Sequence, residues 1–291
     1  MQSRPNVSVI LPVFNMEDFL ADTLRALLAQ EGLTENDQIV VVDNGSTDRS
    51  VEIAQAFSGI RVLHQPKRGS YASRNLGIRH TSGEIIAFLD PDCRPRLNWL
   101  AAVKESMRDP EVMISLGSRN FAANKVQLRV LAAYENKKIC WVLSGGNPSH
   151  VFGYTNNMAV RRSVFDQFGL FQERLRGGDT IYVQQVVHSL GVSVVRFNSQ
   201  MHVDHLEITT TMDYYRKQAI YGGSNECLAR EVPHKPLSNR QRLAVVISLA
   251  REHILNPWQI CLLLFLLVPG ACIYGWGRRN SPSQRIRYVS E

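Results

Sequence analysis

Two carboxylates separated by one residue stand directly after a short apolar run. Asp90 and Asp92 follow residues 84–89, whose five consecutive apolar residues are typical of a strand buried on both faces. Ligands of an open α/β sheet bind beyond the carboxyl ends of its strands, where paired hard oxygens suit Mg²⁺ or Mn²⁺ carrying a phosphorylated ligand. A D-x-D pair also occurs in ordinary solvated turns, so both interpretations stay open for the pair alone.

A second acidic group follows another apolar run. Asp43 comes directly after residues 38–42 and precedes Asn44-Gly45, which supplies a turn. Its carboxylate can accept hydrogen bonds from a base or from a ribose hydroxyl. The alternative is that Asp43 merely closes the turn.

The elements that must position these carboxylates follow a βαβ pattern, which predicts an α/β fold with a parallel sheet between helices. We expect strands at 7–11, 38–42, 60–63 and 84–89, and helices at 17–30, 47–57 and 70–80, with Thr47 or Asp48 capping the second helix. Further along, we expect helices at 99–107, 126–143, 162–168, 179–190 and 211–221, and extended segments at 112–116 and 192–197.

Length and composition limit the class of protein. The chain of 291 residues can form a large domain with an appendage, and its formal net charge of +7 favours anionic partners such as nucleotides or anionic lipid. It carries no signature of a nucleic-acid-binding domain, so we expect no nucleic-acid partner. Five cysteines without a C-x-x-C pair indicate free thiols in a reducing compartment. The N-terminal residues lack a stretch like a signal peptide, so we expect the catalytic part to stay in the cytosol.

The composition changes after Pro233, and residues 260–276 are almost wholly apolar. This run is shorter than the roughly 20 residues that a spanning helix needs, and Pro269 interrupts it. Four arginines follow: Arg278, Arg279, Arg285 and Arg287. A single span would place them outside, against the positive-inside tendency, so interfacial or re-entrant insertion at the cytosolic face is favoured. The alternative is a buried C-terminal helix or an oligomer interface.

The chain carries four motifs in order: PVFN at 12–15, VDNGSTD at 42–48, RNLG at 74–77 and FLDPD at 88–92. Together they resemble the nucleotide-binding half of a family 2 glycosyltransferase with the GT-A fold. The resemblance continues more weakly through TNNMAVRR at 155–162, FGLF at 168–171, GGD at 177–179 and His205, and covers roughly residues 7 to 225. It implies a GT-A nucleotide-diphospho-sugar transferase fold, a Rossmann-like mixed sheet flanked by helices, here with an apolar C-terminal helical appendage.

The resemblance also implies roles for the residues that match its motifs. Asp43 would hold the base, usually uracil, and the loop of Pro12, Val13 and Asn15 would line the nucleotide pocket. Asp90 would face the ribose or the metal, and Asp92 would bind the divalent cation that neutralises the departing diphosphate. Arg74 or Lys67 would add positive charge near the phosphates, or would form a structural ion pair instead.

Inversion at the anomeric carbon requires a base on the face opposite the leaving group. Asp179 matches this base, although Gly178 replaces the glutamate that usually precedes it in the family. Asp179 also has the residue type and position of an N-cap for 180–190, and both roles can hold at once. His205, rather than His202, matches the histidine that completes the metal site in several relatives.

We therefore predict an inverting, metal-dependent glycosyltransferase at the cytosolic face of the membrane. It would move a sugar from a nucleotide sugar, with a UDP-sugar favoured, to a glycan or lipid-linked acceptor. The alternatives are a polyprenyl-phosphate glycosyltransferase and a non-catalytic protein that binds nucleotide sugar. We expect a nucleotide-binding half at 1–95, an acceptor half at 96–230 and a membrane-associating segment at 231–291. Side chains that can meet the acceptor lie between 118 and 157: Tyr134, Lys137, Lys138, Trp141 and the pair Gly145-Gly146.

Overall fold

The computed structural model describes residues 5–174, 176–228 and 231–280, without the side chains of 225–227. Arg285 and Arg287 of the expected membrane segment lie outside the described residues. In chain order the elements are β1 (Val7–Val13), α1 (Glu17–Leu28), β2 (Gln38–Asp43), α2 (Ser50–Gln55), β3 (Ile60–His64), α3 (Ser70–Arg79), β4 (Ile85–Leu89), β5 (Cys93–Pro95), α4 (Trp99–Ser106), β6 (Ile114–Phe121), α5 (Val126–Ser144), η1 (Pro148–His150), β7 (Asn157–Arg161), α6 (Arg162–Phe168), α7 (Gly178–Leu190), η2 (Val192–Val194), β8 (Val195–His205), α8 (Thr211–Leu228), α9 (Asn239–Arg251) and α10 (Pro257–Asn280).

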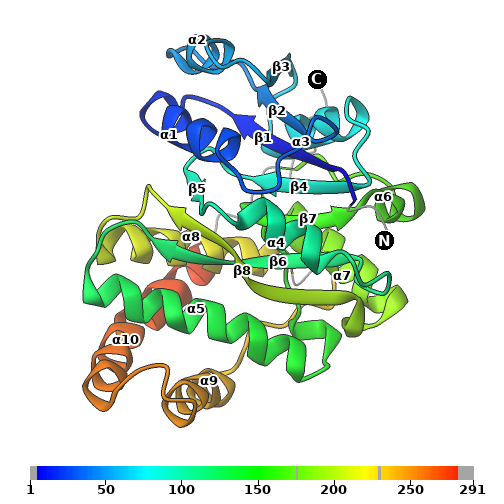
Figure 1. The fold of residues 1–291 in the computed structure, drawn as a ribbon. Coiled ribbons are helices and arrows are strands. Elements are labelled where there is room, and N and C mark those ends of the chain that lie inside the picture. Colours follow the sequence, from blue (N-terminus) through cyan, green and yellow to red (C-terminus); the bar gives the residue numbers. More distant parts are fainter. Residues whose placement is uncertain (1–4, 175, 229–230, 281–291) are drawn as a thin grey trace.

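One mixed sheet in the order β3-β2-β1-β4-β7-β6-β8-β5 forms the centre of the molecule (Figure 1). The first four of these strands are parallel, β7 pairs antiparallel with β4 and with β6, and β8 runs parallel to β6. Every residue of β4 is buried, as its apolar run predicts. The parallel strands therefore end at one edge of the sheet, which carries Asp43 and the D-x-D pair.

Helix α3 lies unusually close to the sheet. A Cβ added at Gly77 would stand 2.6 Å from Cγ2 of Ile10 on β1, so a larger residue would push the helix outward. Arg74 lies one turn before Gly77 on the same helix. The close packing thus holds Arg74 near the carboxyl edge of the sheet.

Several sequence predictions need correction. The strand expected at 192–197 begins as a short 3-10 turn and continues to His205, because pairing with β6 extends it. His202 and His205 therefore lie within β8 rather than after it. Arg49, not Thr47 or Asp48, is the N-cap of α2, although an Asp48 oxygen accepts from the backbone of Ser50 at 3.0 Å. The sequence patterns also gave no sign of β5, β7 and α9, which are short or lack a clear periodicity.

The C-terminal helices α9 and α10 lie at the end of the molecule opposite α2 (Figure 1). Their apolar residues form a core cluster with α5 and α8, which includes Leu131, Tyr215, Val246 and Leu266. The expected boundary near residue 230 stays a prediction.

Helix α10 runs without a break through Pro269, so the expected interruption is wrong. Among the described residues it is the single helix long and apolar enough to cross a membrane, and 28% of its most apolar stretch is buried. One face of α10 packs on α8, where the Tyr215 hydroxyl donates a hydrogen bond to the Leu266 carbonyl at 3.0 Å. A Cβ at Gly277 would stand 2.1 Å from the Ala219 carbonyl, which shows how closely α8 and α10 approach.

Candidate active site

The carboxyl end of β4 holds the two carboxylates in different surroundings. Nη2 of the buried Arg74 donates to Oδ1 of Asp90 at 2.6 Å, while a third of the Asp90 side chain stays exposed. Asp92 is buried, and this burial, together with the charges of Asp90 and Glu207, raises its pKa to about 7. The ionised form of Asp92 is therefore unfavourable by itself, and a bound cation would stabilise it.

His205 completes this acidic site through a strand pairing. Cys93 of β5 lies opposite His205 of β8, which brings Nδ1 of the histidine to 3.4 Å from Oδ2 of Asp92. This buried Nδ1 makes no hydrogen bond to any described residue. Burial, with the charges of Lys217 and Arg119, lowers the pKa of His205 to about 3, so the imidazole is neutral and offers a lone pair.

The ligand atoms of Asp92, Cys93 and His205 lie within 4.8 Å of one another. Burial raises the pKa of the Cys93 thiol well above its usual range, and sulfur suits Mg²⁺ or Mn²⁺ poorly. The carboxylate and the unpartnered imidazole do fit a divalent cation of that class. His202 is engaged elsewhere, since its Nδ1 lies 2.7 Å from the hydroxyl of Ser118.

Asp43 lies at the end of β2, where its carboxylate accepts hydrogen bonds from the backbone of Gly45 and Ser46, each at 3.0 Å. Burial opposes its ionisation, but these bonds and one from His64 outweigh it and hold the pKa of Asp43 below its usual value. Asp43 therefore does close the turn, which was the alternative interpretation of this residue. It leaves Asp43 ionised, so its remaining lone pairs can still accept from a base.

The loop after β1 docks on this turn. The Asn44 amide donates to the Val13 carbonyl at 2.8 Å, and Oδ1 of Asn15 accepts from the Thr47 amide at 2.8 Å. Asn15 has a φ of 53°, a left-handed conformation that asparagine tolerates better than most residues. Pro12 and Val13 are the last residues of β1 rather than the start of the loop, because they pair with Val42 and Asp43 of β2. With Asn15 they lie beside the acidic site, although neither these three residues nor Asp43 line the main cavity described below.

Asp179 lies in the first turn of α7, half-buried against α3. Gly177 is the N-cap, so the interpretation of Asp179 as the cap is wrong. Its Oδ1 accepts from the Thr180 amide at 2.8 Å and its Oδ2 from the Thr155 amide at 3.2 Å. Burial raises the pKa of Asp179, against the hydrogen bonds and the charge of Arg74, which lower it.

Tyr71 fixes the position of this carboxyl. Its hydroxyl accepts from the Asp179 amide at 3.1 Å and also hydrogen bonds to the Asp179 side chain. A Cβ at Gly178 would meet the Tyr71 ring at 3.1 Å. The tyrosine ring therefore occupies the space beside residue 178, where the family usually has a glutamate.

One cavity of about 720 Å³ joins these groups. One end of the cavity is lined by Arg74, Asp90, Asp92, Asp179 and His205. Of the residues expected to meet an acceptor, Tyr134 and Lys138 line the cavity. Lys137 instead forms an ion pair with Glu252, and Lys67 pairs with Glu173 at 2.8 Å, so Lys67 takes the structural role.

Comparison with known proteins decides the family. The sequence profile of glycosyl transferase family 2 matches residues 8–169, more than half of the chain. This chain belongs to glycosyl transferase family 2. The glycosyltransferase is 31% identical over 202 residues to glycosyltransferase AglE of Haloferax volcanii, covering 65% of this chain and 64% of that protein. It is 29% identical over 242 residues to the pre-mycofactocin glycosyltransferase of Mycobacterium tuberculosis, covering 80% and 49%. The transferase thus spans less than two thirds of the length of both relatives.

Solved structures confirm the predicted GT-A fold of the transferase. A mannosyltransferase from Pyrobaculum calidifontis, in complex with GDP-Man and Mn²⁺, matches with a TM-score of 0.61 at 18% identity, covering 93% of this chain and 76% of that one. Glucosyl-3-phosphoglycerate synthase from Mycobacterium tuberculosis, in complex with Mn²⁺, UDP-glucose and phosphoglyceric acid, matches with a TM-score of 0.53 at 18% identity, covering 74% and 78%. At these identities the likeness extends to the fold alone.

Sequence patterns missed several side chains of the transferase that line the cavity. Tyr71 gave no signal, because it lies in an ordinary short helix. Glu135 did carry one, since it lies three residues before the expected Lys138, and the two interrupt the apolar face of α5 and form an ion pair there. Arg119 and Arg242 lie on other elements, and only the tertiary structure brings them to the cavity.

Proposed function

We propose that this glycosyltransferase moves a sugar from a nucleoside diphosphate sugar to a hydroxyl of a glycan or lipid-linked acceptor, with inversion, at the cytosolic face of a membrane. The observation that carries the proposal is the shared cavity. At one end it has the acidic pair with the His205 imidazole, whose Nδ1 makes no hydrogen bond to the described residues, and the half-buried carboxylate of Asp179 lines the same space. These are the groups that metal-assisted displacement by an activated hydroxyl requires.

Asp179 is the general base in this proposal. The acceptor oxygen attacks the anomeric carbon as its proton passes to the Asp179 carboxylate, and the bond from that carbon to the diphosphate oxygen breaks with its electron pair. Tyr71 and the amides of Thr155 and Thr180 hold the carboxylate in place. The raised pKa of Asp179 makes it a stronger base than an exposed aspartate.

Asp92 and His205, with Asp90 beside them, would hold Mg²⁺ or Mn²⁺. When bound, the cation would neutralise charge on the departing diphosphate, so that this group needs no proton. Mn²⁺ accompanies a nucleotide sugar in both of the solved structures named above. Arg74 orients Asp90 through its ion pair and adds positive charge on the phosphate side.

Asp43, with Pro12 and Val13 at the end of β1 and Asn15 in the loop after it, would bind the base of the donor. Arg68 lies 4.3 Å above the ring of Phe14, an exposed aromatic side chain in the same loop. A flat cation and an aromatic ring in this position suit stacking against a planar base. A UDP-sugar stays the favoured donor because the resemblance usually pairs this aspartate with uracil.

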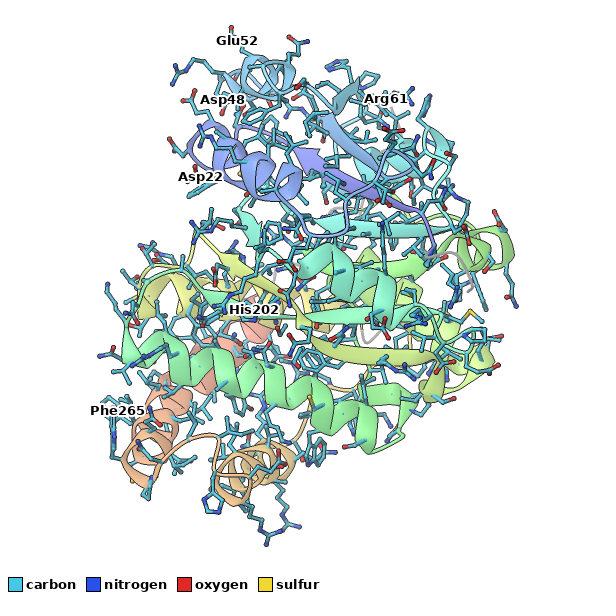
Figure 2. All side chains as sticks on the ribbon, viewed as in Figure 1. Asp22, Asp48, Glu52, Arg61, His202 and Phe265 are labelled. Carbon is cyan, nitrogen blue, oxygen red and sulfur yellow. The ribbon has the colours of Figure 1, made fainter. Side chains whose placement is uncertain are left out.

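Membrane association rests on α10, where four large apolar side chains are more than half exposed: Trp258 (56%), Phe265 (73%), Val268 (65%) and Trp276 (63%). Figure 2 shows Phe265 at the outer side of this helix. Because α10 also packs closely on α8, we propose that it lies in the interface rather than spanning the bilayer.

The first experiment titrates the purified protein with UDP and GDP by calorimetry, with and without Mn²⁺. We expect one nucleotide to bind in a metal-dependent way, with loss of binding in Asp92→Ala. His205→Gln should weaken the Mn²⁺ dependence by about tenfold or more, as loss of a metal ligand does. His202→Gln is the matched control, because that histidine bonds to Ser118 instead. Absence of nucleotide binding with any metal would overturn the proposal.

A further inference from the structure

The cavity continues well beyond the catalytic groups. From Asp92 and Asp179 it passes between β6, α5 and α8 and reaches the C-terminal helices. Its far wall is apolar and consists of Leu243 and Val246 of α9 with residues of α10: Leu264, Leu267, Val268, Ala271 and Cys272. A donor bound at the acidic end would leave this extension empty, so a second molecule can occupy it.

The middle of the cavity is cationic. The Arg119 guanidinium lies 4.8 Å above the ring of Tyr154 and 3.7 Å from Glu135. Lys138 pairs with the same glutamate, which also accepts from the Tyr214 hydroxyl at 2.9 Å. Glu135 therefore forms ion pairs with both Arg119 and Lys138, and these three buried side chains together keep a net positive charge.

Arg242 of α9 adds a further positive charge to the cavity lining. Its Nε donates to the Leu237 carbonyl at 3.1 Å, and its guanidinium lies 5.1 Å above the ring of Tyr274. No acidic side chain of the described residues forms an ion pair with this guanidinium. Arg119, Lys138 and Arg242 thus face the middle of the cavity with Glu135 as the ion-pair acid of the first two, whereas the lining carboxylates Asp90, Asp92 and Asp179 belong to the acidic end.

The apolar end opens on the exposed face of α10. Leu264 and Val268 line the cavity and are also 41% and 65% exposed, and Leu243 on α9 is 51% exposed. The mouth therefore lies within the same apolar surface that we propose contacts the membrane. A molecule that occupies the whole cavity would meet a carboxylate base, then positive charge, then an apolar exit toward lipid.

We propose that the acceptor is an anionic lipid whose phosphorylated headgroup lies against Arg119, Lys138 and Arg242. Its hydrocarbon chain leaves between α9 and α10, past Leu243, Leu264 and Val268, and a hydroxyl of the headgroup reaches Asp179. This inference rests on the proposed function, and it names the class of acceptor and the residues that select it. A neutral, chain-free glycan would use neither the positive charge nor the apolar exit.

Calorimetry with simple probes tests the two features separately. Dodecyl phosphate, below the concentration at which it forms micelles, carries both the charge and the chain, whereas inorganic phosphate lacks the chain and dodecyl maltoside lacks the charge. We expect dodecyl phosphate to bind at least about tenfold more tightly than either of the others. Equal binding of dodecyl phosphate and dodecyl maltoside would overturn the charge assignment, and equal binding of the two phosphates would overturn the chain assignment.

Matched variants locate the site. Val268→Trp fills the mouth, whereas Cys261→Trp adds the same ring to an exposed position of α10 that does not line the cavity. Arg242→Gln removes a lining charge, whereas Arg240→Gln removes an exposed charge of the same helix. We expect Val268→Trp and Arg242→Gln to weaken dodecyl phosphate binding by about tenfold and the controls to leave it within about twofold. Equal effects within either pair would overturn the inference.

Nucleotide binding separates this inference from the proposed function. All four variants should bind nucleotide and Mn²⁺ like the wild type, because they lie away from the acidic pair. If nucleotide binds but dodecyl phosphate does not, the lipid acceptor alone is refuted. If nucleotide fails to bind the wild type, the proposed function is refuted as well.

Discussion

Replacing Asp179 by asparagine tests the assignment of the catalytic base. The change keeps the shape of the side chain but removes its ability to take a proton. General-base catalysis contributes about 10² to 10⁴ in rate, so kcat should fall by that factor, which corresponds to about 2.7 to 5.5 kcal/mol in the activation barrier. Donor binding should stay near the wild-type value, because Asp179 lies apart from the Asp43 loop.

The effect of the same variant on stability follows from its hydrogen bonds. Both carboxylate oxygens accept from amides, of Thr180 and Thr155, and the asparagine NH₂ group cannot replace one of these acceptors. The amide left without a partner costs about 1 to 3 kcal/mol. Folding raises the pKa of Asp179, so its ionised form opposes folding at neutral pH, and asparagine removes that opposition. The two effects offset each other, and we expect a small change in melting temperature.

The assay compares single-turnover rates across pH for wild type, Asp179→Asn and the exposed control Asp18→Asn. Wild-type activity should fall as pH drops through the raised pKa of Asp179, since the base must be ionised. Wild-type rates in Asp179→Asn, with donor binding intact, would refute the assignment. That result would favour an acceptor whose own phosphate oxygen attacks, because such a nucleophile needs no base.

Two further predictions concern the framework of the site. Gly277→Ala should lower stability by about 1 to 3 kcal/mol, because the new Cβ would stand 2.1 Å from the Ala219 carbonyl. Gly275→Ala is the control, because a Cβ there meets nothing within 4 Å, and its stability should equal or exceed that of the wild type. Equal melting temperatures for the two variants would contradict the packing of α10 on α8. Lys104→Met should lower the free energy of unfolding by about 3 to 5 kcal/mol, because it removes the cation that lies 2.6 Å from the fully buried Asp37 carboxylate. A loss below about 1 kcal/mol in denaturant unfolding would argue against that ion pair.

The first half of the fold was predictable because its signals are local. The apolar runs before Asp43 and Asp90 are short, continuous and followed by turn residues, and helix α1 has a clear apolar face that buries Leu20, Leu24 and Leu27. The structure places the corresponding strands β2 and β4 in the parallel part of the mixed sheet. The second half was less predictable because β5 has three residues, and β7 has five of which only the middle three are apolar, so neither shows a continuous apolar run or an alternation.

The sequence by itself determined which carboxylates stand at the carboxyl edge of the sheet, because strand ends are marked by composition. Only the tertiary structure decided which groups join them. His205 meets Asp92 because β8 pairs with β5 across more than a hundred residues of chain, and that pairing follows from packing rather than from local preference. The same holds for the route from the acidic pair past Arg119 and Arg242 to α10. Non-local packing brings those side chains to one cavity, and no pattern within a single segment specifies it.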